Sequence, residues 1–250
     1  MLDRCELWPR QSWDTTPKGF KNKDWYPWRF GRRLSLIWRP LLRLEGGDNP
    51  RYVLSPGLIG TNLMHVLRLY YEGLVPTDQC RTSAMKRWGG EEVNRRGHAF
   101  ASKVFEAMRS VGYQVRLETK IDRLLNEKLT RDFGDVDVLA WRPAGRKVLA
   151  IECKDLRLAK TPNEIAEQLT QFTGQILANG ERDDLLKHID RCNLLKERSQ
   201  VLAETIGMQG QDINIETIVC FSHPVPMQYV KTRLPDVSFM TLQELELAQF

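Results

Sequence analysis

From residue 91 onward, the apolar residues have helical spacing in some segments and the two-residue alternation of strands in others. Val93, Phe100, Val104 and Met108 recur every four or seven residues, which predicts a helix that ends at Gly112. After Gly112, segments with the two-residue alternation of strands are interspersed with segments that have helical spacing and a capping residue at their start. The predicted strands are 113–118, 135–141, 147–153, 213–221 and 237–240, and the further helices begin at 161, 183 and 241. The order predicts an α/β protein.

The first ninety residues predict a smaller α+β module. A strand pattern over 34–44, interrupted by Pro40, is followed by turn residues and a short strand at 52–54. Ser55-Pro56 is a helix N-cap signature, and the apolar residues after it have helical spacing. A polar stretch, 76–90, separates this part from the rest. We therefore expect two domains, 1–90 and 91–250.

Charge is unevenly distributed between these two parts. Residues 1–90 hold 15 Lys and Arg against 8 Asp and Glu, whereas residues 91–250 hold 22 against 24. Basic and aromatic residues alternate near the N-terminus, where the aromatic ones are Trp8, Trp13, Phe20, Trp25, Tyr26, Trp28 and Phe30. Such a segment can contact phosphates and stack on bases, or it can fill grooves on this chain, a protein partner or a second copy.

The apolar runs are only a few residues long, far short of the roughly 20 that cross a bilayer. The first ten residues contain charges where a signal peptide has its apolar stretch. We therefore expect a cytoplasmic protein without a membrane partner. The five cysteines are scattered and form no Cys-x-x-Cys pair, so we expect reduced thiols.

Ionisable residues alternate with apolar ones on the strands 135–141 and 147–153. Asp135 and Asp137 share one face of the first strand, and Glu152 and Lys154 share one face of the second. With a two-residue loop at 144–145, opposed residue numbers sum to 289 and Asp137 faces Glu152. With a four-residue loop at 142–145 they sum to 287 and Asp135 faces Glu152. In both registers the carboxylates lie close together. A three-residue loop at 143–145 would instead pair the carboxylates with aliphatic residues, unless a bulge compensated for it.

Two carboxylates about 4 Å apart repel by roughly 4 kcal/mol at an effective dielectric near 20, so they need a proton, a cation or a lysine nearby. Lys154 could compensate them in a surface ion-pair cluster. The apolar neighbours of Glu152 and the helix after this strand instead indicate a central, covered strand, where charges are costly unless they are used. Asp137 and Glu152 are suitable ligands for Mg²⁺.

This hairpin resembles the catalytic hairpin of the PD-(D/E)xK nuclease superfamily, which has the restriction-endonuclease-like fold. Over residues 91 to about 221, the resemblance implies an αβββαβ core behind the small basic module. It implies that Asp137, Glu152 and the backbone carbonyl of Cys153 hold Mg²⁺, with Mn²⁺ as a substitute. It also implies that Lys154 activates the water and that Gln168 is auxiliary, in a protein that cuts DNA rather than RNA.

The chain departs from the superfamily pattern at two places. No proline precedes Asp137, and Asp135 is an alternative first acid. Many members also carry a glutamate in the first helix, where this chain has Ala101. Glu91, Glu92 and Glu106 are the alternatives in that helix.

Arg95, Arg96 and His98 lie at the predicted start of the first helix. There, side-chain charge and the positive helix end could meet a phosphate, although a solvated helix start has the same composition. His65, His188 and His223 have no partners at metal-ligand spacing and are interpreted as structural.

Two functional hypotheses follow. The first is a metal-dependent endonuclease acting in genome defence, repair or recombination. The alternative is a catalytically inactive nuclease-fold module that binds nucleic acid or serves as an assembly subunit.

Overall fold

The computed structural model describes residues 5–9, 12, 14–26, 32–76, 79–230 and 236–248. The chain divides into two compact units, Met1–Arg95 with Lys160–Glu164, and Arg96–Ala159 with Ile165–Phe250. The division falls after Arg95, inside the long helix α2 (Ser83–Ser110). Each unit is described separately below.

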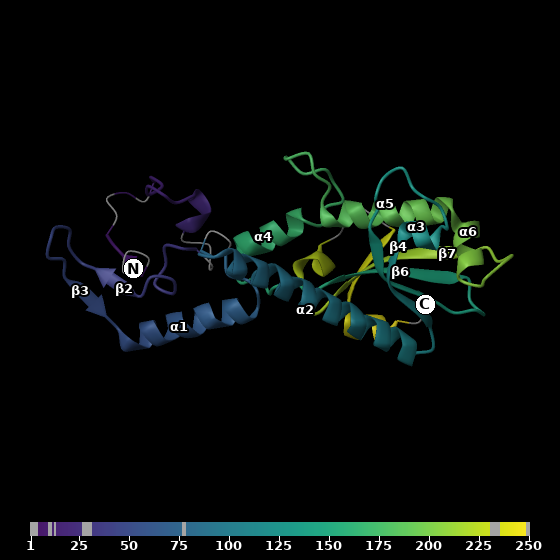
Figure 1. Ribbon diagram of the computed structural model, residues 1–250, viewed down its shortest axis with the longest axis horizontal. Coiled ribbons are helices and arrows are strands. Elements are labelled where there is room, and N and C mark those ends of the chain that lie inside the picture. The colour runs from purple at the N-terminus through teal and green to yellow at the C-terminus, as the bar shows by residue number, and fades with distance from the viewer. Residues whose placement is uncertain are drawn as a thin grey trace. The chain divides into compact units, whose positions relative to one another are not determined.

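The first unit contains a small mixed sheet followed by a helix (Figure 1). The middle strand β2 is parallel to β1 and antiparallel to β3. The elements are β1 (Glu6–Leu7), a 3-10 turn (Asn22–Asp24), β2 (Leu41–Arg43), β3 (Tyr52–Leu54) and α1 (Pro56–Tyr71). Ser55 caps α1, since its side chain accepts a hydrogen bond from the Leu58 N–H. The capped helix and the strand at 52–54 agree with the sequence prediction.

The predicted strand at 34–44 is wrong before residue 41. The N–H groups of Trp38 and Arg39 both donate to the Ser35 carbonyl, which makes this stretch a turn. Pro40 has no N–H to donate to a ladder, and β2 begins directly after it.

The described part of the basic aromatic segment packs within the first unit. The Arg39 guanidinium lies 5.2 Å from the ring centroid of Trp8 and 5.1 Å from that of Phe20. It also donates to the Glu6 carbonyl at 2.7 Å. These contacts favour the structural interpretation of the described aromatic residues. Three of the aromatic residues, Trp13, Trp28 and Phe30, lie outside the described residues.

Helix α2 begins eight residues before its predicted start at residue 91. The Thr82 side chain accepts from the Met85 N–H and supplies the cap. The sequence prediction assigned this part of the helix to the polar stretch 76–90, and the Gly89-Gly90 pair within it has low helix propensity. Gly89 is useful here because its backbone lies close to Gly73: a Cβ atom built on Gly73 would be 2.7 Å from the Gly89 carbonyl oxygen.

The second unit is built on a five-stranded mixed sheet in the order β4-β5-β6-β7-β8. The strands are β4 (Gln114–Lys120), β5 (Asp135–Trp141), β6 (Lys147–Lys154), β7 (Asn214–Phe221) and β8 (Val237–Thr241). Pairing is antiparallel from β4 to β6 and parallel from β6 to β8. The central strand is therefore β6, as its apolar sequence indicated.

The helices of this part of the chain follow or separate the strands. They are α3 (Ile121–Leu124), α4 (Pro162–Thr170), α5 (Asp184–Glu197), α6 (Ser199–Thr205) and α7 (Leu242–Leu247), with a 3-10 turn at Pro226–Tyr229. The short helix α3 was not predicted. Within the described residues, the chain is thus a mixed α/β protein with two mixed sheets and seven α-helices.

Alternate residues of β6 face two different hydrophobic clusters. Val148 and Ala150 pack in one cluster with Leu195 of α5. Leu149 and Ile151 pack in the other, with residues of α2. Figure 1 shows α5 and the second half of α2 on opposite sides of these strands. By this alternation, Glu152 and Lys154 belong to the face that α5 covers.

A buried aspartate fixes the beginning of α5. Asp183 is 2% exposed, and its Oδ1 accepts from the Leu186 N–H at 2.7 Å as an N-cap. Its Oδ2 accepts from the N–H groups of Thr173, Gly174 and Gln175. These residues therefore form a loop around the carboxylate, after the helix that was predicted to begin at residue 161.

Asp183→Ala should destabilise the chain by about 2–3 kcal/mol, because it removes the N-cap of α5 and the common acceptor of the N–H groups at 173–175. The matched control is Thr241→Ala at the exposed cap of α7, which should cost about 1 kcal/mol. Urea unfolding of both variants measures the difference. Equal losses would show that the loop does not depend on Asp183.

Candidate functional site

The hairpin of β5 and β6 brings Asp137 and Glu152 to neighbouring positions. The paired residues are Val138 with Ile151 through Trp141 with Val148, whose numbers sum to 289. Asp137 and Glu152 occupy the next positions in this register. The Asp137 Oδ2 accepts a hydrogen bond from the Cys153 N–H at 2.7 Å, so this carboxylate is attached to the backbone of β6.

The connection of the hairpin differs from the loops considered above. The Gly145 N–H donates to the Arg142 carbonyl, which closes a turn over 142–145. The ladder nevertheless has the sum of 289 expected for the shorter loop, because Arg146 and Lys147 follow the turn before β5 and β6 pair at Val148.

Glu152 is buried and surrounded by basic groups. It is 6% exposed. Its Oε1 lies 3.0 Å from Lys154 Nζ, and its Oε2 lies 2.9 Å from Arg191 Nη1 and 3.7 Å from His188 Nδ1. Burial acts to raise the pKa of Glu152, but the charges of Lys154 and Arg191 outweigh it and hold the pKa below its ordinary value. Glu152 is therefore an ionised carboxylate.

Asp137 is in the opposite electrostatic state. Burial and the charge of Glu152 raise its pKa to about 7, against the smaller opposing effect of the Cys153 N–H. Two adjacent carboxylates with pKa values moved in opposite directions are typical of functional acid pairs. Near neutral pH, one of them is ionised and the other exchanges a proton.

Lys154 lies between two carboxylates. Its Nζ is 3.0 Å from Glu152 and 3.4 Å from Asp184 on α5. Burial acts to lower the pKa of Lys154, but these acidic neighbours raise it above its ordinary value. Lys154 is therefore a fixed ammonium group at neutral pH, which suits it to stabilise negative charge.

Helix α5 supplies three residues to this cluster that sequence reasoning missed. Asp184, His188 and Arg191 are separated by four and three residues, so they lie on one side of the helix. Their spacing was visible in the sequence, but the strand that they face was not. His188 is fully buried, which lowers its pKa to about 4 and keeps it neutral, as expected for a structural histidine.

Arg191 joins the helix to both strands of the hairpin. Besides its ion pair with Glu152, its guanidinium donates to the carbonyl of Asp135 and to that of Lys187. Asp135, the alternative first acid, is thus held through its backbone. In the described residues, no contact joins its carboxylate to Glu152 or Lys154.

A third acidic residue lies next to Asp137 on the neighbouring strand β4. The β4–β5 register pairs Leu117 with Val138 and Thr119 with Val136, which leaves Glu118 opposite Asp137. Glu118 has a φ of +45° and interrupts the ladder there. Its carboxylate is an ion-pair partner of His98, whose pKa it raises. The sequence gave no sign of this kink, because Glu118 looks like an ordinary strand residue.

The basic residues assigned to phosphate contact are not at a helix start. Because α2 begins at Ser83, Arg95, Arg96 and His98 lie well inside it, and the positive helix end is too far away to assist them. Each has an acidic partner: Arg95 pairs with Glu92, Arg96 with Asp155 at 2.8 Å, and His98 with Glu118. The helix-end part of that prediction is therefore wrong.

Gln168 is not brought to Glu152 by any contact among the described residues. Its side-chain amide donates to the carbonyl of Arg157. It lines a largely apolar cavity of about 270 Å³ together with Leu158, Ile165 and Tyr229. The hydrogen bond to Arg157 gives the amide nitrogen a local partner, whereas the side-chain oxygen of Gln168 is buried and accepts no hydrogen bond from the described residues.

The donor set limits what the cluster can bind. Within the described residues, no group of three or more His, Cys, Asp and Glu side chains is placed to hold a metal ion. Two carboxylates and a backbone carbonyl, the set implied by the resemblance, form a smaller group. All five cysteines are free thiols.

Comparison with known proteins assigns the chain to a family. The model of the family described as anti-phage protein Upx-like matches residues 1–239. The chain belongs to the Upx-like family of anti-phage proteins. This membership agrees with the genome-defence setting among those predicted. No curated protein and no solved structure matches the chain. In the described part of this Upx-like protein, no helix is long and apolar enough to cross a membrane.

Asp137→Asn should stabilise the metal-free protein more at pH 8 than at pH 5. An acid with a raised pKa stabilises the folded state below about pH 4, and this contribution is lost as the pH rises through 7. Asparagine avoids that loss, so we expect a gain of roughly 1–3 kcal/mol at pH 8. Urea unfolding in EDTA, with the exposed Asp132→Asn as control, measures it. A gain that does not depend on pH would refute the assignment.

Arg191→Ala should destabilise the chain by about 3 kcal/mol or more, because it leaves Glu152 ionised and buried with one partner fewer. The control is Arg182→Ala, which breaks the more exposed pair with Asp190 and should cost under about 1 kcal/mol. Urea midpoints compare the two. A loss as small as that of the control would mean that Arg191 is not needed to hold the carboxylate.

Proposed function

We propose that this Upx-like protein is a Mg²⁺-dependent nuclease that cuts DNA in phage defence. The observation that carries the proposal is the meeting of Asp137, Glu152 and Lys154 on one face of the β5–β6 hairpin, in the centre of a covered sheet. The element order of the second unit, a helix, three strands, helices and a further strand, also supports a restriction-endonuclease-like core, with the short α3 inserted. The choice of DNA rests on the resemblance to the PD-(D/E)xK superfamily.

The residues present fit a hard divalent cation. Glu152 Oε2 is buried and accepts no hydrogen bond of good geometry from the described residues, although Arg191 lies near it. It therefore has acceptor capacity that a cation could use. Asp137, Glu152 and the Cys153 carbonyl would hold the ion, and all three offer the oxygen donors that Mg²⁺ prefers. When bound, the cation would act as a Lewis acid on the phosphate.

The protein's own groups would contribute in different ways. The Lys154 ammonium, fixed by Glu152 and Asp184, would offset the charge that develops on the attacked phosphate and orient the water. Asp137, whose pKa is about 7, would lose its proton completely when a cation binds beside it, and its carboxylate would then add a second negative charge to that of Glu152. Arg191 and His188, both on α5, would hold the carboxylate of Glu152 in position.

A second function is favoured by one observation. Glu152 already has two cationic partners, Lys154 and Arg191, so the site is electrically compensated without a metal. A catalytically inactive nuclease-fold module, which binds nucleic acid or assembles with other subunits, would keep such a cluster for stability alone.

Lys154→Ala should reduce DNA cleavage at least about 100-fold, because one preorganised positive group is lost at the attacked phosphate. The assay incubates the purified full chain with plasmid and linear DNA in Mg²⁺ or Mn²⁺, and with EDTA as the metal-free control. Lys147→Ala, on the same strand but exposed and paired with Glu216, should cut like the wild type.

The outcomes separate the two functions. Cleavage that survives Lys154→Ala in a folded preparation, judged by circular dichroism, would refute the mechanism. Absence of cleavage in the wild type with every metal, combined with salt-sensitive DNA binding that Lys154→Ala preserves, would instead support the inactive module.

A further inference from the structure

Helix α1 carries apolar side chains on two sides. Leu69 is buried, whereas a second set of apolar residues is exposed. The exposed set consists of Ile59, Leu63, Met64, Leu67, Tyr70 and Tyr71. At 100° per residue these positions fall within an arc of about 140°, so they form one continuous stripe. A helix that is apolar on both sides normally has a partner on each.

Strand β3 extends this stripe toward the sheet. Val53 and Leu54 are exposed, and the chain passes from Leu54 through Ser55 directly into α1. β3 is the outer strand in the order β1-β2-β3, and in the described part of the chain no strand pairs with its other edge. An exposed apolar edge strand is a template for pairing with another chain.

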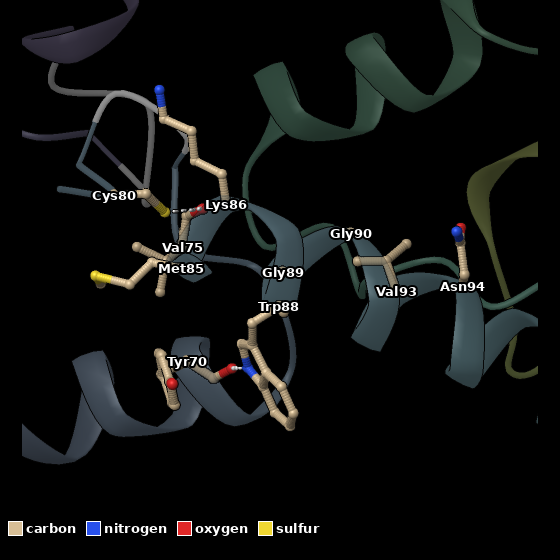
Figure 2. Close-up of a pocket in the computed structure, with 11 residues that line it drawn as sticks. Tyr70, Val75, Cys80, Met85, Lys86, Trp88, Gly89, Gly90, Val93 and Asn94 are labelled. Atoms are coloured by element: carbon tan, nitrogen blue, oxygen red, sulfur yellow. Dashed lines mark hydrogen bonds between the residues drawn. The ribbon is translucent and has the colours of Figure 1, made fainter. Parts of the chain in front are cut away.

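The other end of the stripe is held in place by α2. Tyr70 and Trp88 are stacked, with ring centroids 5.9 Å apart, and the Trp88 indole N–H donates to the Tyr70 carbonyl at 3.2 Å (Figure 2). The same residues line a cavity of about 330 Å³ with Val75, Met85 and Val93. The aromatic end of the stripe is therefore preorganised for binding.

We propose that this surface, made of the outer face of α1 and the edge of β3, pairs with the same surface of a second copy of the chain. The proposal is independent of the nuclease function, and it concerns a surface other than the basic aromatic segment.

The charge of the surface selects this partner. Arg68 is the one Lys, Arg, Asp or Glu residue within α1; it lies outside the arc of the stripe and is paired with Glu72 at 2.8 Å. A nucleic acid or an anionic bilayer would require cations free to meet its phosphates, whereas Arg68 is held by Glu72 and Arg51, beside β3, is held by Glu45. An uncharged apolar surface, in contrast, is complementary to itself, as a twofold interface requires.

The size of the surface also agrees with a dimer. Its eight apolar side chains, two on β3 and six on α1, are each between 38% and 70% exposed. Together they offer an area of the order of the roughly 800 Å² per partner that specific interfaces bury.

A charge-exchange experiment tests the pairing. Leu63 stands near the middle of the stripe, so a twofold axis would bring it close to the partner's Leu63. Leu63→Glu and Leu63→Lys should each weaken dimerisation at least 100-fold, measured by sedimentation velocity of the full chain over a range of concentrations. Mixing the two variants should restore the dimer mass, because opposite charges then meet. Leu158→Glu, at an exposed leucine of the second unit, is the control and should remain dimeric.

Three results would overturn the proposal. The first is a wild-type chain that stays monomeric up to about 100 μM. The second is an unchanged dimer mass in both Leu63 variants with unchanged circular dichroism spectra. The third is flotation of a monomeric wild type with phosphatidylglycerol vesicles that Leu63→Glu abolishes, which would assign the stripe to a bilayer.

Discussion

The second unit of this protein depends on keeping one carboxylate ionised in the middle of its sheet. Glu152 lies on the central strand, where an unpaired charge would cost several kcal/mol. Its two cationic partners come from different places: Lys154 from the same strand and Arg191 from α5. The helix is thus tied to the sheet by charge as well as by its apolar face. The charge of Glu152 also contributes to the raised pKa values of Asp137 and Lys154.

The acid pair gains its asymmetry from this arrangement. Lys154 and Arg191 form ion pairs with Glu152 and lower its pKa, whereas burial and the repulsion of Glu152 raise the pKa of Asp137 more than the Cys153 N–H and the same two cations lower it. A structural ion pair has no need of a second carboxylate with a pKa near neutrality. Asp137 is therefore the residue that most favours a functional interpretation over a purely structural one. The family membership supplies the biological setting, defence against phage, but not the chemistry.

The sequence predicted the hairpin well because its pattern is local. Alternation places Asp137 with Glu152 and Lys154, and the observed register is one of those that alternation allows. The partners from α5 could not be predicted, since helical spacing reveals a common side but not the strand beneath it. The ends of helices could not be predicted where tertiary contacts determine them. The loop at 173–175 forms hydrogen bonds to Asp183, and the backbone of Gly89 packs against that of Gly73. Propensity carries no information on such contacts.

The change of strand direction at β6 has a consequence for how the cluster assembles. β6 pairs with β5 across a short turn, but its parallel partner β7 lies about sixty residues further along the chain. Pairing β5 with β6 costs less chain entropy than pairing β6 with β7, because the connecting segment is shorter. The β5–β6 hairpin is therefore expected to form first. The two carboxylates would then meet while still hydrated, and dehydration would follow only when α5 docks. Because Arg191 is part of α5, it would pair with Glu152 in the same step in which docking of α5 removes water from this carboxylate.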